Sequence, residues 1–581
     1  MKNRTIKNVF LTLIVFGSVI SCNDYLDINS DPNNISIDNV TPNELLPVGI
    51  TANYRVQARD VNQFANVIMN MTAGNSIVYG GPFTDYYVPN INNTFFNGIW
   101  DGLYRATANL DKIVTYNDPT NKYVKQKAIA KIVKANYIQI LTDFYGDMPY
   151  SEAFKGQNNL APKYDKGEDI YKASYAELEN AKALIDSGAG DEVGAVDIVF
   201  GGDMAKWKAF ANTLQLRYLL RMSNVTGDMA TFRDQKLALL SGATFIDEDV
   251  LENPGYSSSN DAQQNPYTNY YLYTSSGSRG SAYAINVASE NAAIILNGNP
   301  DGDTRGAYQK FNNIVDLRRP RMFTLIGGKV SGIRQGNTPG QPGVPSAASR
   351  FTFGINIGKG TPTSTEEYID LASAKSGCIM TRAESKFLQA EAALRYPSLF
   401  SSALSNFNEG IAASFDTYGS APNLADQYIA TIAAVPGLGF AGSITNKIDA
   451  IMTQKWIALA GRNPEQSFFD YSRTGFPVTL SATTASKPKP NRLMYPLSEF
   501  IANSGNVPKI GTEDVFSKNQ YTPFWNRNQF NFSSIKKTTL LSGFFLCLKR
   551  RNILMKANYC RRRNFSFKIY QASSSKKLGI E

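Results

Sequence analysis

Apolar residues recur at helical spacing along most of the chain, and this pattern predicts a mainly α-helical protein. Steps of three and four residues place side chains on one face of a helix. The clearest stripe consists of Ile129, Ile132, Val133, Tyr137, Ile140, Leu141 and Phe144. Gly146 and Pro149 follow this stripe and predict the end of its helix. Similar stripes run through residues 207–218 and 444–459. We interpret each stripe as part of the core.

Residues 382–416 predict a pair of short helices. The first helix is expected from Arg382 to Tyr396, and Pro397 interrupts the pattern. The second helix is expected from Ser401 to Asp416. Two short helices within about 34 residues are typical of a tetratricopeptide unit. The sequence therefore predicts tetratricopeptide-like helix pairs that form a scaffold.

Long segments rich in Gly, Ser, Asn and Pro separate the helical patterns, at residues 74–98, 252–283 and 327–364. Irregular loops of this length are usually functional. In the first two segments we single out Tyr79, Phe83, Tyr86, Tyr87, Tyr256, Tyr267, Tyr270, Tyr271 and Tyr273. These rings either fix the loops to the body, which we favour for most of them, or form a recognition surface. A tyrosine can stack on a sugar ring or grip a peptide. If the two loops converge, their tyrosines form one ligand-binding platform.

The beginning of the chain has the pattern of a lipoprotein signal. A basic start, residues 1–7, precedes a short apolar run, residues 9–20. This order is typical of a secretory signal, and the run is shorter than the roughly 20 residues that a transmembrane helix needs. The tetrapeptide VISC, which ends in Cys22, fits the bacterial lipobox. We expect a signal peptide over 1–21, lipidation of Cys22, and a tether over 22–40 that anchors the protein to a membrane.

The chain contains no histidine, and this absence excludes several chemistries. Ser-His-Asp and Cys-His catalysis and His-ligated zinc all need an imidazole. The four cysteines form no C-x-x-C pair, so neither a thiolate zinc site nor a disulfide framework is expected. Gly437–Gly442 matches a dinucleotide-binding pattern, but no strand is predicted before it. We expect no cofactor and assign no metal or catalytic residue. A glycosidase, which needs only two carboxylates, stays open.

The positive charge of the chain is concentrated at its end. The formal net charge is +10, and residues 526–581 hold 13 Lys or Arg and one acid. Subtracting their +12 and the +3 of residues 1–21 leaves −5 for residues 22–525, which does not indicate nucleic-acid binding. Residues 526–581 are either a basic tail that binds acidic lipid or glycan or, as we favour, a disordered product of out-of-frame translation.

Seven segments, taken in order, resemble the SusD/RagB-like outer-membrane lipoproteins, and most closely the SusD-like branch. The resemblance covers nearly all of residues 20–525. The segments are CNDYLDINSDPNN, AIAKIVKANYIQILTDFYGDMPYSEAF, YDKGEDIYKASYAELENAKALID, GGDMAKWKAFANTLQLRYLLRMS, TRAESKFLQAEAAL, TQKWIALAGRNPEQSFFDYSRTGFP and NRLMYPLSEF. Each segment alone is a weak signal, but all seven in this order are specific.

The resemblance implies a cell-surface binding protein rather than an enzyme. Its residues 41–525 would form a single helical domain in which helix pairs hold irregular ligand-binding loops. Proteins of this kind sit over a TonB-dependent outer-membrane transporter, called SusC-like, and capture oligosaccharides or, in some members, oligopeptides. No binding residue is carried over from the family. A surface glycoside hydrolase and a non-catalytic scaffold or adhesin are the alternatives.

Overall fold

The computed structural model describes residues 40–80, 91–305, 308–352, 354, 364–480 and 487–527. The chain divides into two compact units, Met1–Phe530 and Asn531–Glu581. The description below concerns the first unit. The expected signal peptide, Cys22 and nearly all of the tether lie outside the described residues, as does the expected tail from residue 528 onward.

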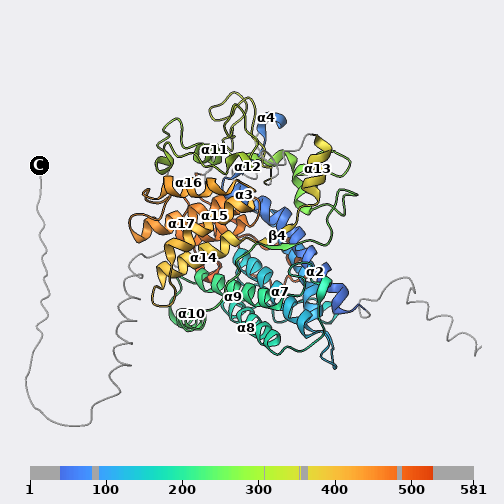
Figure 1. Ribbon diagram of the computed structural model, residues 1–581. Helices are drawn as coiled ribbons and strands as arrows, with labels where there is room; N and C mark the ends of the chain where they lie inside the picture. Colours follow the sequence, from blue (N-terminus) through green and yellow to red (C-terminus); the bar gives the residue numbers. More distant parts are fainter. Residues whose placement is uncertain are drawn as a thin grey trace, which may run out of the picture. The chain divides into compact units, whose positions relative to one another are not determined.

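The first half of the unit is a series of helices, each packed against its neighbours in sequence (Figure 1). Contacts join α2 to α6, α6 to α7, α7 to α8 and α8 to α9. The bounds are α2 Pro42–Val56, α3 Asn62–Ile68, α6 Asn97–Val114, α7 Val124–Tyr145, α8 Gly167–Asp186, α9 Met204–Arg221 and α10 Gly227–Leu239. Helix α7 is buried on nearly all sides, as expected for a helix surrounded by others.

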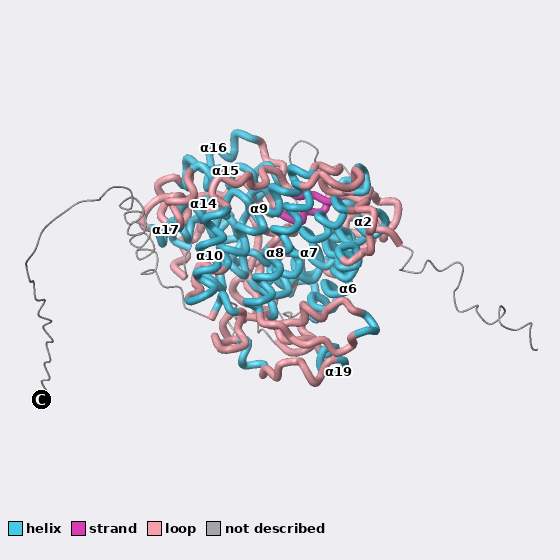
Figure 2. Tube along the Cα trace, turned by 90° about the horizontal axis from the view of Figure 1, so that it is seen from below, coloured by secondary structure: helices cyan, strands magenta, loops and turns pink. Residues whose placement is uncertain are grey.

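A second set of helices follows residue 380 and repeats this arrangement. Helix α14 packs against α15 and α17, and α17 packs against α18. The bounds are α14 Arg382–Arg395, α15 Ala403–Thr417, α16 Pro422–Ile432, α17 Ile444–Leu459, α18 Pro464–Thr474 and α19 Leu497–Ala502. In Figure 2 the helices of both sets are drawn in cyan, and α19 lies within a loop-rich part of the unit.

Buried charges join the two sets of helices. Asp470 of α18 accepts hydrogen bonds from Lys455 of α17 at 2.9 Å and from Arg221 of α9 at 3.1 Å. Arg473, one turn along α18, donates to Asp470 at 2.8 Å and to Glu391 of α14 at 2.6 Å. All five side chains are almost fully buried. Paired, hydrogen-bonded charges of this kind specify which helices contact one another.

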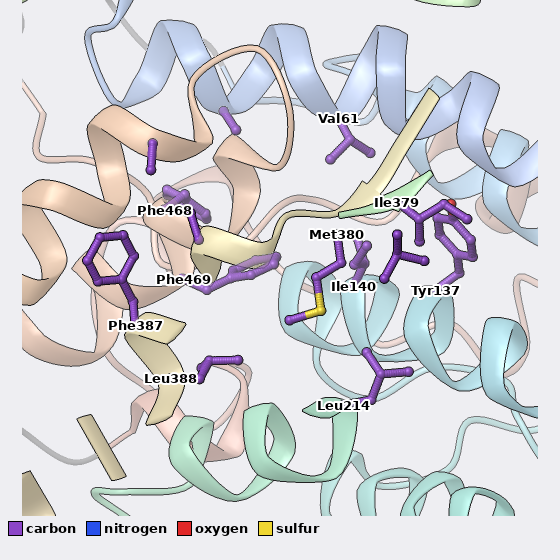
Figure 3. Packing of buried hydrophobic residues seen from close by; sticks show 14 of the residues in the cluster. Val61, Tyr137, Ile140, Leu214, Ile379, Met380, Phe387, Leu388, Phe468 and Phe469 are labelled. Carbon is purple, nitrogen blue, oxygen red and sulfur yellow. The ribbon is translucent and has the colours of Figure 1, made fainter. Parts of the chain in front are cut away.

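The same helices enclose the apolar core. Figure 3 shows Phe468 and Phe469 of α18 between Phe387 of α14 and the helices α7 and α9. The Phe469 ring lies 4.7 Å from that of Phe144. The packed residues continue to the end of the described chain, where the Trp525 ring contacts Phe469 and is 1% exposed.

The segment between the two sets of helices consists mostly of loops, and we call it, together with residues 70–80, the loop layer. Most of it lies at the top of Figure 1, while its strand β4 (Gly377–Met380) lies lower, near α2. Its short elements are β1 Thr72–Ala73, α4 Ser76–Tyr79, β2 Val250–Glu252, β3 Val287–Ala288, α11 Glu290–Leu296, α12 Arg319–Met322, α13 Thr365–Ser373 and β4 Gly377–Met380. Strand β1 pairs with β3 and strand β2 with β4, both antiparallel.

The prediction of a mainly helical fold with paired helices and long loops is confirmed. The three apolar stripes lie on α7, α9 and α17. The pair expected within residues 382–416 is α14 and α15, and both helices end within two residues of the expected bounds. Thr381 caps α14 by accepting a hydrogen bond from the Glu384 amide, at 3.0 Å.

Candidate functional site

Three of the tyrosines singled out in the sequence are buried, as expected for rings that fix a loop to the body and not for members of an exposed platform. Tyr256, Tyr267 and Tyr271 are between 1% and 8% exposed. Their hydroxyls bind groups inside the protein: Glu252, Asn286 and the Arg59 carbonyl, respectively. These rings fix the second loop to the helices, and a ligand at the surface cannot reach them.

The other singled-out residues differ in position. Tyr79 ends α4 and is 58% exposed. Tyr270 is half-buried, and its hydroxyl donates to Gln63 at 3.0 Å. Tyr273 is half-buried and belongs to the cluster described below. Phe83, Tyr86 and Tyr87 lie outside the described residues.

The described ends of the first two loops lie side by side. Thr72 and Ala73 pair with Ala288 and Val287 through strands β1 and β3. Beyond this pairing, the Asn75 amide donates to the Ala284 carbonyl at 2.9 Å. Helix α4 therefore begins beside the segment that carries Tyr283.

Tyr273, Tyr283 and Tyr368 form a cluster of half-buried rings in the loop layer. The Tyr273 ring lies 5.5 Å from Tyr283 and 6.1 Å from Tyr368, the second contact being edge to face. The hydroxyls of Tyr273 and Tyr283 are 3.3 Å apart. We call these three residues, with Arg279 and Arg350, the tyrosine cluster.

The two arginines of the cluster hold the Tyr283 ring. The Arg350 guanidinium carbon lies 3.3 Å from the ring centroid, and its Nη1 donates to the Tyr283 carbonyl at 2.6 Å. Arg279, which is exposed, lies 5.0 Å from the same centroid. Cation–π contacts of this kind are stronger where water is partly excluded. The ring is therefore held in one orientation.

Local structure explains why these residues meet. Tyr273 and Arg279 form a bridge across a tight turn, in which the Thr274 amide donates to Ser278 at 2.8 Å. Gly277 has φ +82° and provides the left-handed residue that this turn needs. Tyr368 comes from α13, which Thr268 holds by donating to the Ala372 carbonyl at 2.6 Å.

The tyrosine hydroxyls of the cluster are hydrogen-bonding groups. Burial raises the pKa of the Tyr368 and Tyr273 hydroxyls, and Tyr283 raises that of Tyr273 further. Both hydroxyls are therefore protonated at neutral pH and can donate hydrogen bonds. No group of three or more Cys, Asp or Glu side chains within the described ranges could hold a metal ion.

Sequence reasoning missed Tyr283, Tyr368, Arg279 and Arg350. Tyr283 lies at the edge of the second loop, and Tyr368 lies in a helix. One signal was available for Tyr283: a Ser- and Gly-rich turn, residues 274–278, separates it from Tyr273. A turn flanked by tyrosines predicts that their rings meet. Arg350, 67 residues along the chain from Tyr283, carries no such local signal.

The fold is therefore a helical scaffold whose loops carry a half-buried aromatic cluster. The SusD-like family described as "Starch-binding associating with outer membrane" matches residues 32–496. The chain belongs to this family. No helix within the described parts of the chain is both long and apolar enough to cross a membrane.

Solved structures share the fold. A chitin-binding SusD homolog from Flavobacterium johnsoniae is 22% identical, with a TM-score of 0.63, over 84% of this chain and 99% of that one. A SusD homolog from Parabacteroides distasonis is 19% identical, with a TM-score of 0.66, over 84% and 99%. A SusD/RagB family protein from Bacteroides thetaiotaomicron is 19% identical, with a TM-score of 0.62, over 84% and 100%. No curated protein matches the chain.

Proposed function

We propose that this protein is a non-catalytic surface lipoprotein that captures oligosaccharides through the tyrosine cluster. Lipidated Cys22 anchors it to the outer membrane, and it delivers its ligand to a SusC-like TonB-dependent transporter. The family description, which names starch binding and association with the outer membrane, supports carbohydrate as the ligand class. The structure of a chitin-binding homolog with the same fold adds a second candidate polysaccharide.

The single observation that carries the proposal is the arrangement of Tyr273, Tyr283 and Tyr368. Their half-buried rings leave apolar surface at the edge of the loop layer, and two hydroxyls lie within 3.3 Å of each other. Sugars present apolar ring faces and hydroxyl groups together, so they suit a surface with both features. Tyr79 and Tyr270 remain proposed contacts of the same ligand.

The test combines a ligand screen with one variant of the cluster. A glycan array and a peptide panel identify the ligand, and calorimetry then measures its Kd. We expect Tyr368→Ala to weaken glycan binding by about 1–2 kcal/mol, roughly 5- to 30-fold, because a ring at the contact is lost.

The matched control is Tyr116→Ala, which removes a half-buried ring after α6, in the helical scaffold. We expect its affinity to equal that of the wild type. If both variants bind glycans like the wild type, the ligand contacts another surface. Binding to the peptide panel alone would replace oligosaccharides with oligopeptides as the ligand.

A further inference from the structure

A hollow separate from the tyrosine cluster lies in the loop layer, beside the end of β3. Its volume is about 120 Å³, and it is open to solvent on one side. Glu290, Arg305 and Arg334 line it from three segments that are distant in the sequence, together with Asn291, Tyr308 and Gln335. We call this hollow the Glu290 pocket.

The charges of the Glu290 pocket balance. Arg334 forms a bidentate ion pair with Glu290, in which Nε donates to Oε2 at 2.6 Å and Nη2 donates to Oε1. Arg305 lies 3.3 Å from the same Oε1 and pairs with Asp303 at 2.6 Å. Asp303 is not part of the lining, but its carboxylate pairs with Arg305, so two guanidinium groups and two carboxylates offset one another here and leave little net charge to attract a phosphate or a free carboxylate. An uncharged ligand fits this balance.

The pocket retains both donors and acceptors for a ligand. A guanidinium carries five N–H donors, and within the described residues no hydrogen bond uses Nη1 of Arg305 or of Arg334. Gln335 donates its amide N–H groups to the Val67 and Thr72 carbonyls, at 3.2 and 2.9 Å. This anchoring leaves its side-chain oxygen as an acceptor. Hydroxyl groups of a sugar both donate and accept, and so can use both kinds of group.

The base of the pocket is held rigidly before any ligand binds. Tyr308 and Asn291 are 2% and 5% exposed, and the Tyr308 hydroxyl donates to Asn291 Oδ1 at 2.8 Å. Asn291 Nδ2 donates in turn to the Asn70 carbonyl at 3.1 Å. Polar groups that are fixed in advance lose little entropy when a ligand binds.

The size of the pocket limits its ligand to one ring or its substituents. A volume of about 120 Å³ is well below the roughly 300–1,000 Å³ of pockets that enclose a drug-sized ligand. Seven residues separate Glu290 from Tyr283, a distance of at most about 25 Å along an extended chain. An oligosaccharide of several rings can therefore span both places, whereas a single ring can occupy only one of them.

We propose that the Glu290 pocket is a second carbohydrate subsite, which holds one uncharged hydroxyl- or acetamido-bearing ring of a glycan bound at the tyrosine cluster. This inference rests on the proposed function. Two linked contacts raise affinity through effective concentration. The subsite therefore selects longer chains, because only they occupy both places.

The test measures affinity against chain length with the full chain. The probes are chito-oligosaccharides and malto-oligosaccharides, from single rings to long oligomers, followed by calorimetry. Arg334→Lys keeps the charge opposite Glu290 but removes the planar fork of donors. We expect about tenfold weaker binding of the long oligomers, the effect of one lost charge-assisted hydrogen bond, with short oligomers unchanged.

Two further variants make the result specific. Arg105→Lys makes the same exchange at an exposed position of α6 and should bind every length like the wild type. Arg305→Lys tests the pocket from its other side if Arg334→Lys fails to fold.

The outcomes separate the subsite from the proposed function. Wild-type affinity of Arg334→Lys for every length, with weaker binding by Tyr368→Ala, would overturn the subsite and leave the proposed function standing. An equal loss at all lengths would also overturn the subsite, because the pocket would then not be a separate contact. If the wild type binds neither these two series nor any glycan of the array, both proposals fail.

Discussion

At the scale of single residues, burial separates the acids of the core into two groups. Burial alone would raise the pKa of Asp470, but Lys455, Arg473 and Arg221 outweigh it and hold that pKa below its ordinary value. Glu465 lacks comparable partners, and burial, with a smaller contribution from Glu384, raises its pKa to about 8. Glu465 Oε2 is buried and has no hydrogen-bond partner among the described residues.

Glu465 makes stability depend on pH. In the unfolded chain it ionises near its ordinary pKa of 4.5, whereas in the folded protein its pKa is about 8. Between these values the folded state holds a proton that the unfolded state has released, so this group's contribution to stability falls as pH rises. We expect Glu465→Gln to be about 1–3 kcal/mol more stable than the wild type at pH 8.5, with the difference shrinking towards pH 5.

Urea unfolding at both pH values measures this difference. The control is Asp228→Asn, which neutralises an exposed carboxylate at the start of α10. It should change stability similarly at the two pH values. If Glu465→Gln is less stable than the wild type at pH 8.5, the ionised carboxylate of Glu465 stabilises the folded protein, and the prediction is wrong.

At the scale of elements, each helix pair depends on rings that interlock across it. Phe407 of α15 is 1% exposed, and its ring lies 6.1 Å from Phe387 of α14 and 5.2 Å from Phe440. Gly410, one turn along, permits this approach, because a Cβ at that position would lie 2.8 Å from the Phe387 ring. Leu404, on the same helix, is 54% exposed.

Truncation of Phe407 tests this packing. We expect Phe407→Ala to lower the free energy of unfolding by about 3–5 kcal/mol, because it leaves a cavity between the helices. Leu404→Ala should change it by less than about 0.5 kcal/mol, since the side chain faces solvent. Chemical denaturation measures the free energy of unfolding of both variants. If both variants lose a similar amount, the Phe407 ring does not make the main contact between α14 and α15.

The sequence predicted the helices well and the loops poorly, for physical reasons. Helix α7 is visible because its apolar residues repeat at a fixed spacing, and a local pattern suffices to specify a helix. Nothing local distinguishes Tyr271, whose hydroxyl binds the Arg59 carbonyl across 212 residues, from the half-buried Tyr273. The position of a loop ring depends on such distant partners. The cluster could be assembled only from the structure, because Arg350 and Tyr368 reach it from other segments.

At the scale of the whole molecule, we propose that one chain carries both a membrane anchor and a ligand-binding surface. The family is described as associating with the outer membrane, and the proposed link is the lipid on Cys22. The first described helix, α2, begins at Pro42, twenty residues after that cysteine. Loss of the lipid should therefore affect location and not folding.

Cys22→Ser tests the anchor. We expect the variant to leave the membrane fraction while its melting temperature and glycan affinity stay at wild-type values, because Cys22 precedes the first described helix by twenty residues. Fractionation with lipid labelling measures the change. Retention of the unlabelled variant in the membrane fraction would mean that another contact holds the protein there.

The central claim is that the loop layer binds the glycan and the helix pairs only support it. Hydrogen exchange, with and without the best glycan from the array, tests this claim most directly. The account predicts slower exchange at residues 268–285 and 364–373, which carry the three tyrosines of the cluster, and unchanged exchange in α8 and α15. Protection confined to the helices, with the loop segments unaffected, would contradict it.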